Sequence, residues 1–211
     1  TWGRGEWGRL GLGDSSDALV PTQIDFDDDG FQPVAALTGE THSAVVGANG
    51  ELLTWGRNEH WQLGYEVGGL LNSGQSFDAQ QEPQTVDLRP EGDDGEQPRV
   101  VRAAVDETGT SVQLSDGNVL VWGLRRYFEP TKIPAIMEVL GGETIAQVEL
   151  GDSHVAVRTE SGAVFTFGTG AALGHTKAER KSWELQRVQS LADSPVAHVE
   201  CGPNITAFIV E

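Results

Sequence analysis

The sequence lacks the features that stabilise or anchor a chain covalently or in a membrane. It contains one cysteine, Cys201, so no disulfide can form within the chain, which favours a reducing, intracellular compartment, cytoplasmic or nuclear. No stretch approaches the roughly 18 apolar residues of a membrane span, and the N-terminus has no charged-then-apolar secretion signal. Since the chain opens on Thr1 and its one methionine is Met137, we expect processing or a longer parent chain.

Positive charge is also scarce. Lysine and arginine number 14 against 32 aspartate and glutamate residues, and the formal net charge is −18. Because such a surface repels phosphate, neither direct nucleic-acid binding nor docking on an anionic membrane is expected. A basic protein partner is the natural complement, although solubility alone explains an acidic surface equally well.

Glycine, in contrast, is abundant. The 27 glycines neither recur at every third position nor accompany many prolines, which excludes collagen and indicates many tight turns. Helical periodicity is nearly absent. The composition and pattern therefore predict an all-β protein built from short strands.

Three segments align without gaps, and each runs from a turn glycine through a β-prone stretch to an aromatic residue followed by glycine. The Asn-Gly and Asp-Gly pairs at two of these turns predict β-hairpins, because both turn positions need positive φ angles. The chain opens on the tail of a fourth copy, Trp2-Gly3. The three complete copies run from Gly50 to Trp55-Gly56, from Gly117 to Trp122-Gly123, and from Gly162 to Phe167-Gly168.

The four aromatic residues are separated by 53, 67 and 45 positions. Periods near 50 residues, each with about four short strands, are typical of β-propeller blades. We therefore expect one propeller domain over residues 1–211. Its units are expected at about 1–53, 54–120, 121–165 and 166–211.

A Gly-x-x-His motif precedes two of the turns, with its histidine at His42 and His154. A residue that returns once per blade is more often structural than catalytic, so we expect both histidines to hydrogen-bond within the blade framework. We expect Trp2, Trp55, Trp122 and Phe167 to fill the space between blades. The copy before Gly117 keeps the length but lacks the motif.

Together these motifs resemble the regulator of chromosome condensation repeat over nearly the whole chain. The resemblance rests on Gly39–Ser43 (Gly-x-x-His-Ser), on Gly50–Gly56 (Gly-x-Leu-x-x-Trp-Gly), and on the Trp55–Gly64 loop. It implies an all-β propeller with about four blades present, part of a ring that usually has seven. A half ring leaves open sheet edges, so the remaining blades are expected from unseen sequence or from another chain.

The resemblance also implies a partner-binding face. In exchange factors of the family, that face is built by the residues between the repeat glycine and histidine. The family's exchange chemistry uses acidic and histidine side chains just before that histidine, where this chain has threonine, serine or asparagine. The matching positions are Glu40, Thr41, Glu107, Thr108, Asp152, Ser153, Pro203 and Asn204.

Because of these departures from the family pattern, we rank three hypotheses for the function. The first is a non-catalytic protein-interaction scaffold, possibly one subunit of a larger assembly. The alternative is a guanine nucleotide exchange factor for a small GTPase. Light-sensing members of the family carry tryptophan and arginine within the motif, so a photoreceptor is the least expected of the three.

Other candidate binding segments lie where the sequence departs from the repeat pattern. Two inserts, 67–82 and 89–99, lengthen the second unit, and each is either a wedge against a partner or a plain surface loop. Arg125, Arg126, Tyr127 and Phe128 replace the glycine-rich loop of the third unit. Arginine beside aromatic residues is typical of interface anchors, although burial of the two rings beneath the loop is equally expected.

The sequence offers no site for covalent or metal chemistry. His60, His175 and His198 share no metal-ligand spacing with one another or with Cys201. The acidic stretch 25–30 resembles a calcium loop, but its twelfth position is Ala36 where a glutamate is required. We therefore expect no metal, no cofactor and no enzymatic activity beyond the possible exchange of a nucleotide.

Overall fold

The computed structural model describes residues 1–26, 30–67, 79–89, 95–107, 109–123, 135–137, 143–152, 154–175 and 181–210. Within these ranges the regular structure is short antiparallel strands and the 3₁₀ turns η1 (Glu6–Gly8), η3 (Ala171–Leu173) and η4 (Gln189–Leu191). In this part of the chain no helix is long and apolar enough to cross a membrane.

The strands form three four-stranded sheets and one two-stranded sheet, each in the order of the sequence. The first sheet contains β1 (Pro33–Thr38), β2 (His42–Gly47), β3 (Leu52–Arg57) and β4 (Ala79–Thr85). The second contains β5 (Val100–Val105), β6 (Gly109–Leu114), β7 (Val119–Gly123) and β8 (Ala135–Met137). The third contains β9 (Ile145–Gly151), β10 (His154–Thr159), β11 (Val164–Thr169) and β12 (Lys181–Arg187), and the last contains β13 (Val196–Gly202) and β14 (Ile205–Val210).

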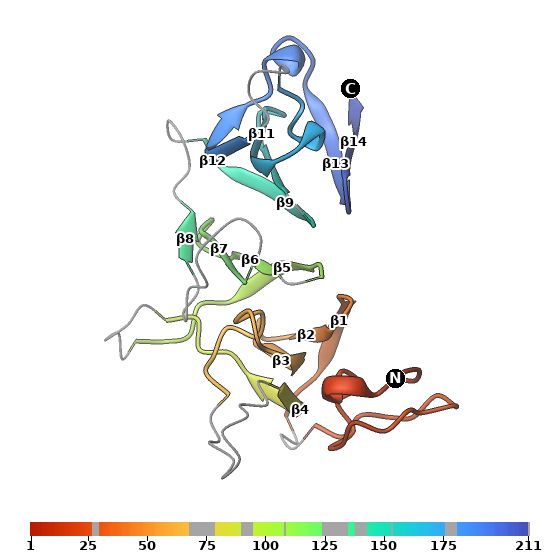
Figure 1. Cartoon of the computed structure of the whole chain (residues 1–211). Helices are drawn as coiled ribbons and strands as arrows, with labels where there is room; N and C mark the ends of the chain where they lie inside the picture. Colours follow the sequence, from red (N-terminus) through yellow and green to blue (C-terminus); the bar gives the residue numbers. More distant parts are fainter. Residues whose placement is uncertain are drawn as a thin grey trace.

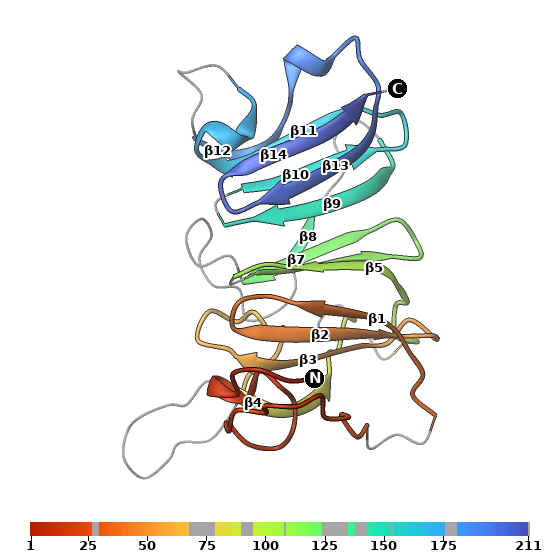
Figure 2. The ribbon, with the colours of Figure 1, turned by 90° about the vertical axis from the view of Figure 1, so that its right-hand side faces the viewer.

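The sheets follow one another as blades along a partial ring (Figure 1). The N-terminal segment lies at one end of the row and β14 at the other, and the turned view shows the sheets layered one above the next (Figure 2). The predicted all-β propeller with about four blades is confirmed.

The aligned motifs form the second and third strands of each blade. Gly50, Gly117 and Gly162 have φ values of 86°, 89° and 80°, the left-handed conformation that the hairpin turn requires. In the hairpins, His42 pairs with Gly56 and His154 pairs with Gly168. The repeat histidine therefore stands opposite the glycine that follows the aromatic residue.

The sheets of the structure do not begin and end where the units predicted from the sequence do. The expected unit boundaries near residues 53, 120 and 165 fall within β3, β7 and β11. Each aromatic residue from which the units were counted lies on the third strand of a sheet. A unit counted in this way starts in one blade and ends in the next.

Pro83 lies in the interior of a strand, a position that proline rarely takes in a sheet. It lies inside β4, where Thr54 pairs with Gln84 and Gly56 pairs with Gln80, leaving an irregularity opposite Trp55. A proline is tolerated there because β4 is the edge strand of its sheet and the bulge needs no ladder hydrogen bond.

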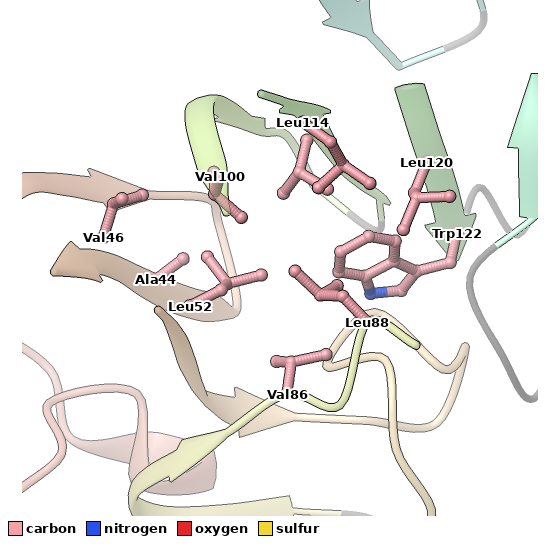
Figure 3. Close-up of a cluster of buried hydrophobic side chains, with 10 residues drawn as sticks. Ala44, Val46, Leu52, Val86, Leu88, Val100, Leu114, Leu120 and Trp122 are labelled. Carbon is pink, nitrogen blue, oxygen red and sulfur yellow. The ribbon is translucent and has the colours of Figure 1, made fainter. Parts of the chain in front are cut away.

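The core lies between the blades rather than within one sheet. Between the first two sheets, Val46 and Leu52 pack in one cluster with Leu114, Leu120 and Trp122, as Figure 3 shows. Each fully buried side chain of this size contributes about 1.5–3 kcal/mol to stability. A similar cluster joins the second and third sheets through β7, β9, β10 and β11.

The aromatic residues follow the prediction at three of four positions. Trp55, Trp122 and Phe167 are buried, but the side chain of Trp2 is 65% exposed. Each buried tryptophan packs on a loop that precedes it. The indole N–H of Trp55 donates to the carbonyl oxygen of Arg9, 46 positions earlier, and the described residues make no such contact with Trp2.

Candidate functional site

Four equivalent segments meet where the first strand of each blade ends. They are residues 38–40, 105–107, 150–152 and 201–203, and together they line a hollow of about 370 Å³. We call this the inner hollow. Because every blade supplies the same three positions, the fold itself repeats the chemistry of the site around one axis.

The inner hollow is acidic. Glu40, Asp106, Glu107 and Asp152 line it, and none of its lining residues is basic. Cys201 also lies there, and burial raises the pKa of its thiol to about 12, so the sulfur stays protonated and is a poor nucleophile. In the described part of the chain no cluster of side chains is placed to hold a metal ion. The hollow therefore offers a field that attracts cations rather than a reactive group.

The structure brings together four of the predicted binding residues, Glu40, Glu107, Asp152 and Pro203. Thr41 lies behind them, and its hydroxyl donates a hydrogen bond to the carbonyl oxygen of Glu107, 3.2 Å away in the next blade. Asn204 lies elsewhere, in a second hollow beside β14. Thr108, Ser153, Arg125, Arg126, Tyr127, Phe128, residues 68–78 of the first insert and residues 90–94 of the second lie outside the described residues.

Asp106 is the lining residue that the sequence interpretation missed. It occupies the place of the repeat glycine in the copy that lacks the Gly-x-x-His motif. Its Oδ1 accepts a hydrogen bond of 2.5 Å from the backbone N–H of Gly109. The replacement of the repeat glycine by an acidic residue was the feature of the sequence that could have identified Asp106.

The repeat histidines connect neighbouring blades. Nε2 of His42 lies 2.9 Å from Oγ1 of Thr110, and Nε2 of His154 lies 2.7 Å from Oγ1 of Thr206. Thr110 donates its hydroxyl proton to the carbonyl oxygen of Gln62, 2.7 Å away, so Nε2 of His42 must be the donor toward Thr110. Nδ1 is buried in both histidines and has no partner among the described residues.

The environment keeps these histidines neutral. Burial lowers the pKa of His42 to about 4. Burial also lowers the pKa of His154, against the opposing effect of the Asp152 carboxylate. A second proton would place an N–H at Nδ1, where no acceptor is described. The histidines therefore act as neutral connectors between blades.

The repeat glycine is required by the same contact. A Cβ at Gly39 would overlap the carbonyl oxygen of Asp106 in the next blade. A Cβ at Gly151 would crowd both the carbonyl oxygen of Gly202 and the ring of His154. Gly-x-x-His is thus a packing motif in which glycine admits the backbone of the next blade and histidine hydrogen-bonds to a threonine hydroxyl of that blade.

A second contact joins each of the first two sheets to the loop that precedes it. The carbonyl oxygen of Arg9 accepts hydrogen bonds from Ser43 Oγ at 2.9 Å and from Trp55 Nε1 at 3.0 Å. The carbonyl oxygen of Gln62 likewise accepts from Thr110 Oγ1 and from Trp122 Nε1, at 2.7 and 3.0 Å. We call such a loop carbonyl, with its hydroxyl and indole donors, the carbonyl latch.

Replacing Thr110 by valine is expected to lower the free energy of unfolding by about 1–2 kcal/mol, because the Gln62 carbonyl loses a buried donor and His42 loses its acceptor. Urea unfolding measures the change. Thr22→Val, at an exposed threonine, is the control and should stay within about 0.5 kcal/mol of the native chain. Equal effects at the two positions would contradict a role for the latch.

Comparison with known proteins places these motifs in context. The regulator of chromosome condensation (RCC1) repeat matches residues 1–46. The human probable E3 ubiquitin-protein ligase HERC3 is 31% identical over 181 residues, which cover 82% of this chain and 16% of that protein. The ultraviolet-B receptor UVR8 of Arabidopsis thaliana is 28% identical over 211 residues, 96% of this chain and 44% of the receptor.

Solved structures agree on the fold. The crystal structure of Prp20p from Saccharomyces cerevisiae has a TM-score of 0.79 and 20% sequence identity, covering 100% of this chain and 50% of that one. The chain spans less than half the length of both curated relatives.

Proposed function

Because the chain belongs to the regulator of chromosome condensation repeat family, we propose that it is a non-catalytic protein-binding propeller whose inner hollow takes a basic segment of a partner. The observation that carries the proposal is the convergence of Glu40, Asp106, Glu107 and Asp152 on one hollow with no basic lining residue. Carboxylates so arranged hydrogen-bond well to arginine and lysine side chains.

Size and charge support the same kind of partner. A hollow of about 370 Å³ is at the lower end of the range for ligand pockets and is large enough for one or two long basic side chains. The net charge of −18 extends the attraction beyond the site and would speed the encounter with a cationic partner. Prp20p, which has the same fold, is described with binding properties toward Gsp1p and histones, and histones are basic proteins.

The test is binding of a fluorescein-labelled oligo-arginine peptide, followed by fluorescence anisotropy at low and high salt. The triple variant Glu40→Gln, Glu107→Gln, Asp152→Asn is expected to lose about tenfold in affinity, since each rim charge contributes several tenths of a kcal/mol. Salt should weaken binding by the native chain more than binding by the variant.

A matched control distinguishes binding of the peptide in the hollow from its attraction to the net charge of the chain. Glu96→Gln, Glu160→Gln, Asp193→Asn removes the same number of charges from exposed positions outside the hollow. The control should keep nearly the native affinity. If both triple variants lose affinity equally, the peptide is attracted by net charge alone, and the inner hollow is not the binding site.

Guanine nucleotide exchange on a small GTPase is the second candidate, favoured by the fold shared with Prp20p and its binding toward Gsp1p. Thr41 stands just before the repeat histidine, where the family's exchange factors use acidic or histidine side chains. A nucleotide-release assay with purified small GTPases separates the two functions. Acceleration of release by the chain would favour exchange over scaffolding.

A further inference from the structure

Two aligned loop residues, Arg9 and Gln62, reach the acidic segments of the inner hollow. Each of them precedes a Leu-Gly pair and supplies the carbonyl oxygen of a carbonyl latch. Glu40 and Glu107 are aligned in the same way, because each follows the first position of its Gly-x-x-His segment or the counterpart of that segment. The latch uses only the backbone of Arg9 and Gln62, which leaves their side chains for another role.

The guanidinium of Arg9 is held on one side and donates to the hollow's acidic segment on the other. Its Nε donates to the carbonyl oxygen of Glu6 at 2.8 Å, and its Nη2 lies 3.2 Å from Glu6 Oε2. The remaining Nη1 donates to the carbonyl oxygen of Glu40 at 3.0 Å. Because a guanidinium is planar and rigid, the contacts with Glu6 fix the direction of this third hydrogen bond. Arg9 thereby holds the backbone that carries the Glu40 carboxylate.

The side chain of Gln62 reaches the next acidic segment through one hydroxyl. Gln62 is 0% exposed, and its Oε1 accepts a hydrogen bond of 2.9 Å from the backbone N–H of His60. This contact turns Nε2 toward Thr41, whose Oγ1 lies 3.5 Å away. The Thr41 hydroxyl in turn donates to the carbonyl oxygen of Glu107 at 3.2 Å. Gln62 therefore holds the backbone of Glu107 through Thr41, whereas Arg9 holds its acidic segment directly.

The last described sheet lacks both parts of this arrangement. Ala172 is the residue aligned with Gln62, because its carbonyl oxygen accepts from the hydroxyl of Thr206 in the same way. Its methyl side chain has no hydrogen-bond donor. The residue of the hollow that corresponds to Glu40 is there Pro203, which carries no charge. Among the described loops, a side-chain donor and a carboxylate in the hollow are thus present together or absent together.

The positive charge of Arg9 makes its place informative. A carboxylate on a fixed backbone binds a cation at a smaller entropic cost than a carboxylate on a mobile loop. A guanidinium beside an acidic site also repels a basic partner. Positioning and charge therefore predict effects of opposite sign when the side chain is removed.

We propose that Arg9 and Gln62 are positioning residues of the inner hollow, which raise its affinity for a basic partner by holding the loops of Glu40 and Glu107. Neither side chain lines the hollow, and neither contacts the partner. Thr41 does not line the hollow either and acts as a link, not as a contact. This inference rests on the proposed binding of a basic segment and adds to it the residues that preorganise the site.

The first test is the direction in which Arg9→Ala changes the affinity for the fluorescein-labelled oligo-arginine peptide. If Arg9 positions Glu40, the peptide binds about three- to fivefold more weakly. Arg4→Ala is the matched control, because it removes the same charge at an exposed position of the same loop, outside the hollow. The control should bind the peptide as the native chain does, or slightly more tightly. Tighter binding by Arg9→Ala would mean that Arg9 acts through its charge alone, and it would overturn the proposal.

The second test compares Thr41→Val with Thr41→Ser. Valine keeps the size of threonine but breaks the hydrogen-bonded link between Gln62 and Glu107, whereas serine keeps the hydroxyl. Thr41→Val is expected to lose about threefold in peptide affinity, and Thr41→Ser to stay within about twofold of the native chain. Since no charge changes, the salt dependence of binding should equal that of the native chain. Equal losses in the two variants would show that the hydroxyl is not a link.

The positioning of the hollow and the proposed function can fail separately. Loss of affinity in the triple carboxylate variant, with native binding by Arg9→Ala and Thr41→Val, would leave the hollow as the binding site and overturn the role of these residues. Native affinity in the triple carboxylate variant would overturn the proposed function, and the positioning inference with it. Urea unfolding of each variant shows that the chain is still folded when the peptide is added.

Discussion

Replacing Trp122 with alanine is expected to lower the free energy of unfolding by about 3–5 kcal/mol, the largest effect of any single substitution considered for this chain. The indole is 1% exposed and packs in the cluster between the first two blades, beside Leu88 and Leu120 (Figure 3). The variant loses this packing and also leaves the Gln62 carbonyl with one donor fewer. Urea or thermal unfolding at low protein concentration measures the change.

Trp2→Ala is the matched control for Trp122→Ala. It deletes the same side chain at the equivalent repeat position, but one that is exposed. The expected change is within about 0.5 kcal/mol. A comparable loss of stability in both variants would show that the ring of Trp2 is buried in solution, and it would contradict the arrangement described for the N-terminal segment.

The blades were predictable because their signals are local. Within each sheet, every strand pairs with the strand that follows it in the sequence. The hairpin turns need a positive φ angle at Gly50, Gly117 and Gly162, and glycine at these positions can be recognised from the sequence alone. The spacing of the aromatic-Gly pairs indicated the length of the repeat. The exposure of Trp2 was not predictable from the motif, because burial depends on the preceding blade and not on the residue itself.

The missing histidine of the second blade has an explanation that lies in another blade. His42 and His154 each meet a threonine one blade further on, at Thr110 and Thr206. The residue that would meet position 109 is Val155, which has no hydroxyl, and the aromatic residue beside it is Phe167, which has no N–H. Donor and acceptor are therefore lost together, a correlation that only the packing of blades makes visible.

The candidate site was predictable in part for a related reason. Glu40, Glu107 and Asp152 follow the first strand of successive blades, so an aligned repeat brings them to one hollow. Pro203 is the equivalent residue of the last blade and also lines the hollow. Asn204, which aligns with Thr41, lies beside Ile205 and Thr206, where β14 faces the third blade. A one-position step along an extended chain changes the face to which a side chain points.

Acidification is expected to cause the second large change in the free energy of unfolding. The pKa of His42 is about 4 in the folded chain and 6.5 in the reference state. Because the folded pKa is lowered, the unfolded chain binds the proton first, and stability falls as the pH drops from about 6.5 to about 4. A difference of this size corresponds to roughly 3 kcal/mol at the lower limit. His154, whose pKa is lowered by burial, adds to the loss in the same direction.

Two other contributions have the opposite sign. Burial raises the pKa of Glu149, so its protonation on acidification favours the folded chain. Protonation of other carboxylates also reduces the self-repulsion of a chain with a net charge of −18. The informative quantity is therefore the difference between two proteins measured over the same pH range, in which these shared contributions cancel.

His42→Gln is the variant for that comparison, because its amide N–H₂ can still donate to Thr110 while the side chain cannot take up a proton. Urea unfolding of both proteins from pH 7 to pH 4 should show the native chain losing stability relative to the variant, with the difference approaching 3 kcal/mol. The variant is expected to be the less stable of the two at pH 7, where glutamine fits the histidine site imperfectly. Parallel curves would mean that His42 takes up its proton equally well in the folded and unfolded chains, and a neutral connector buried between two blades cannot do that.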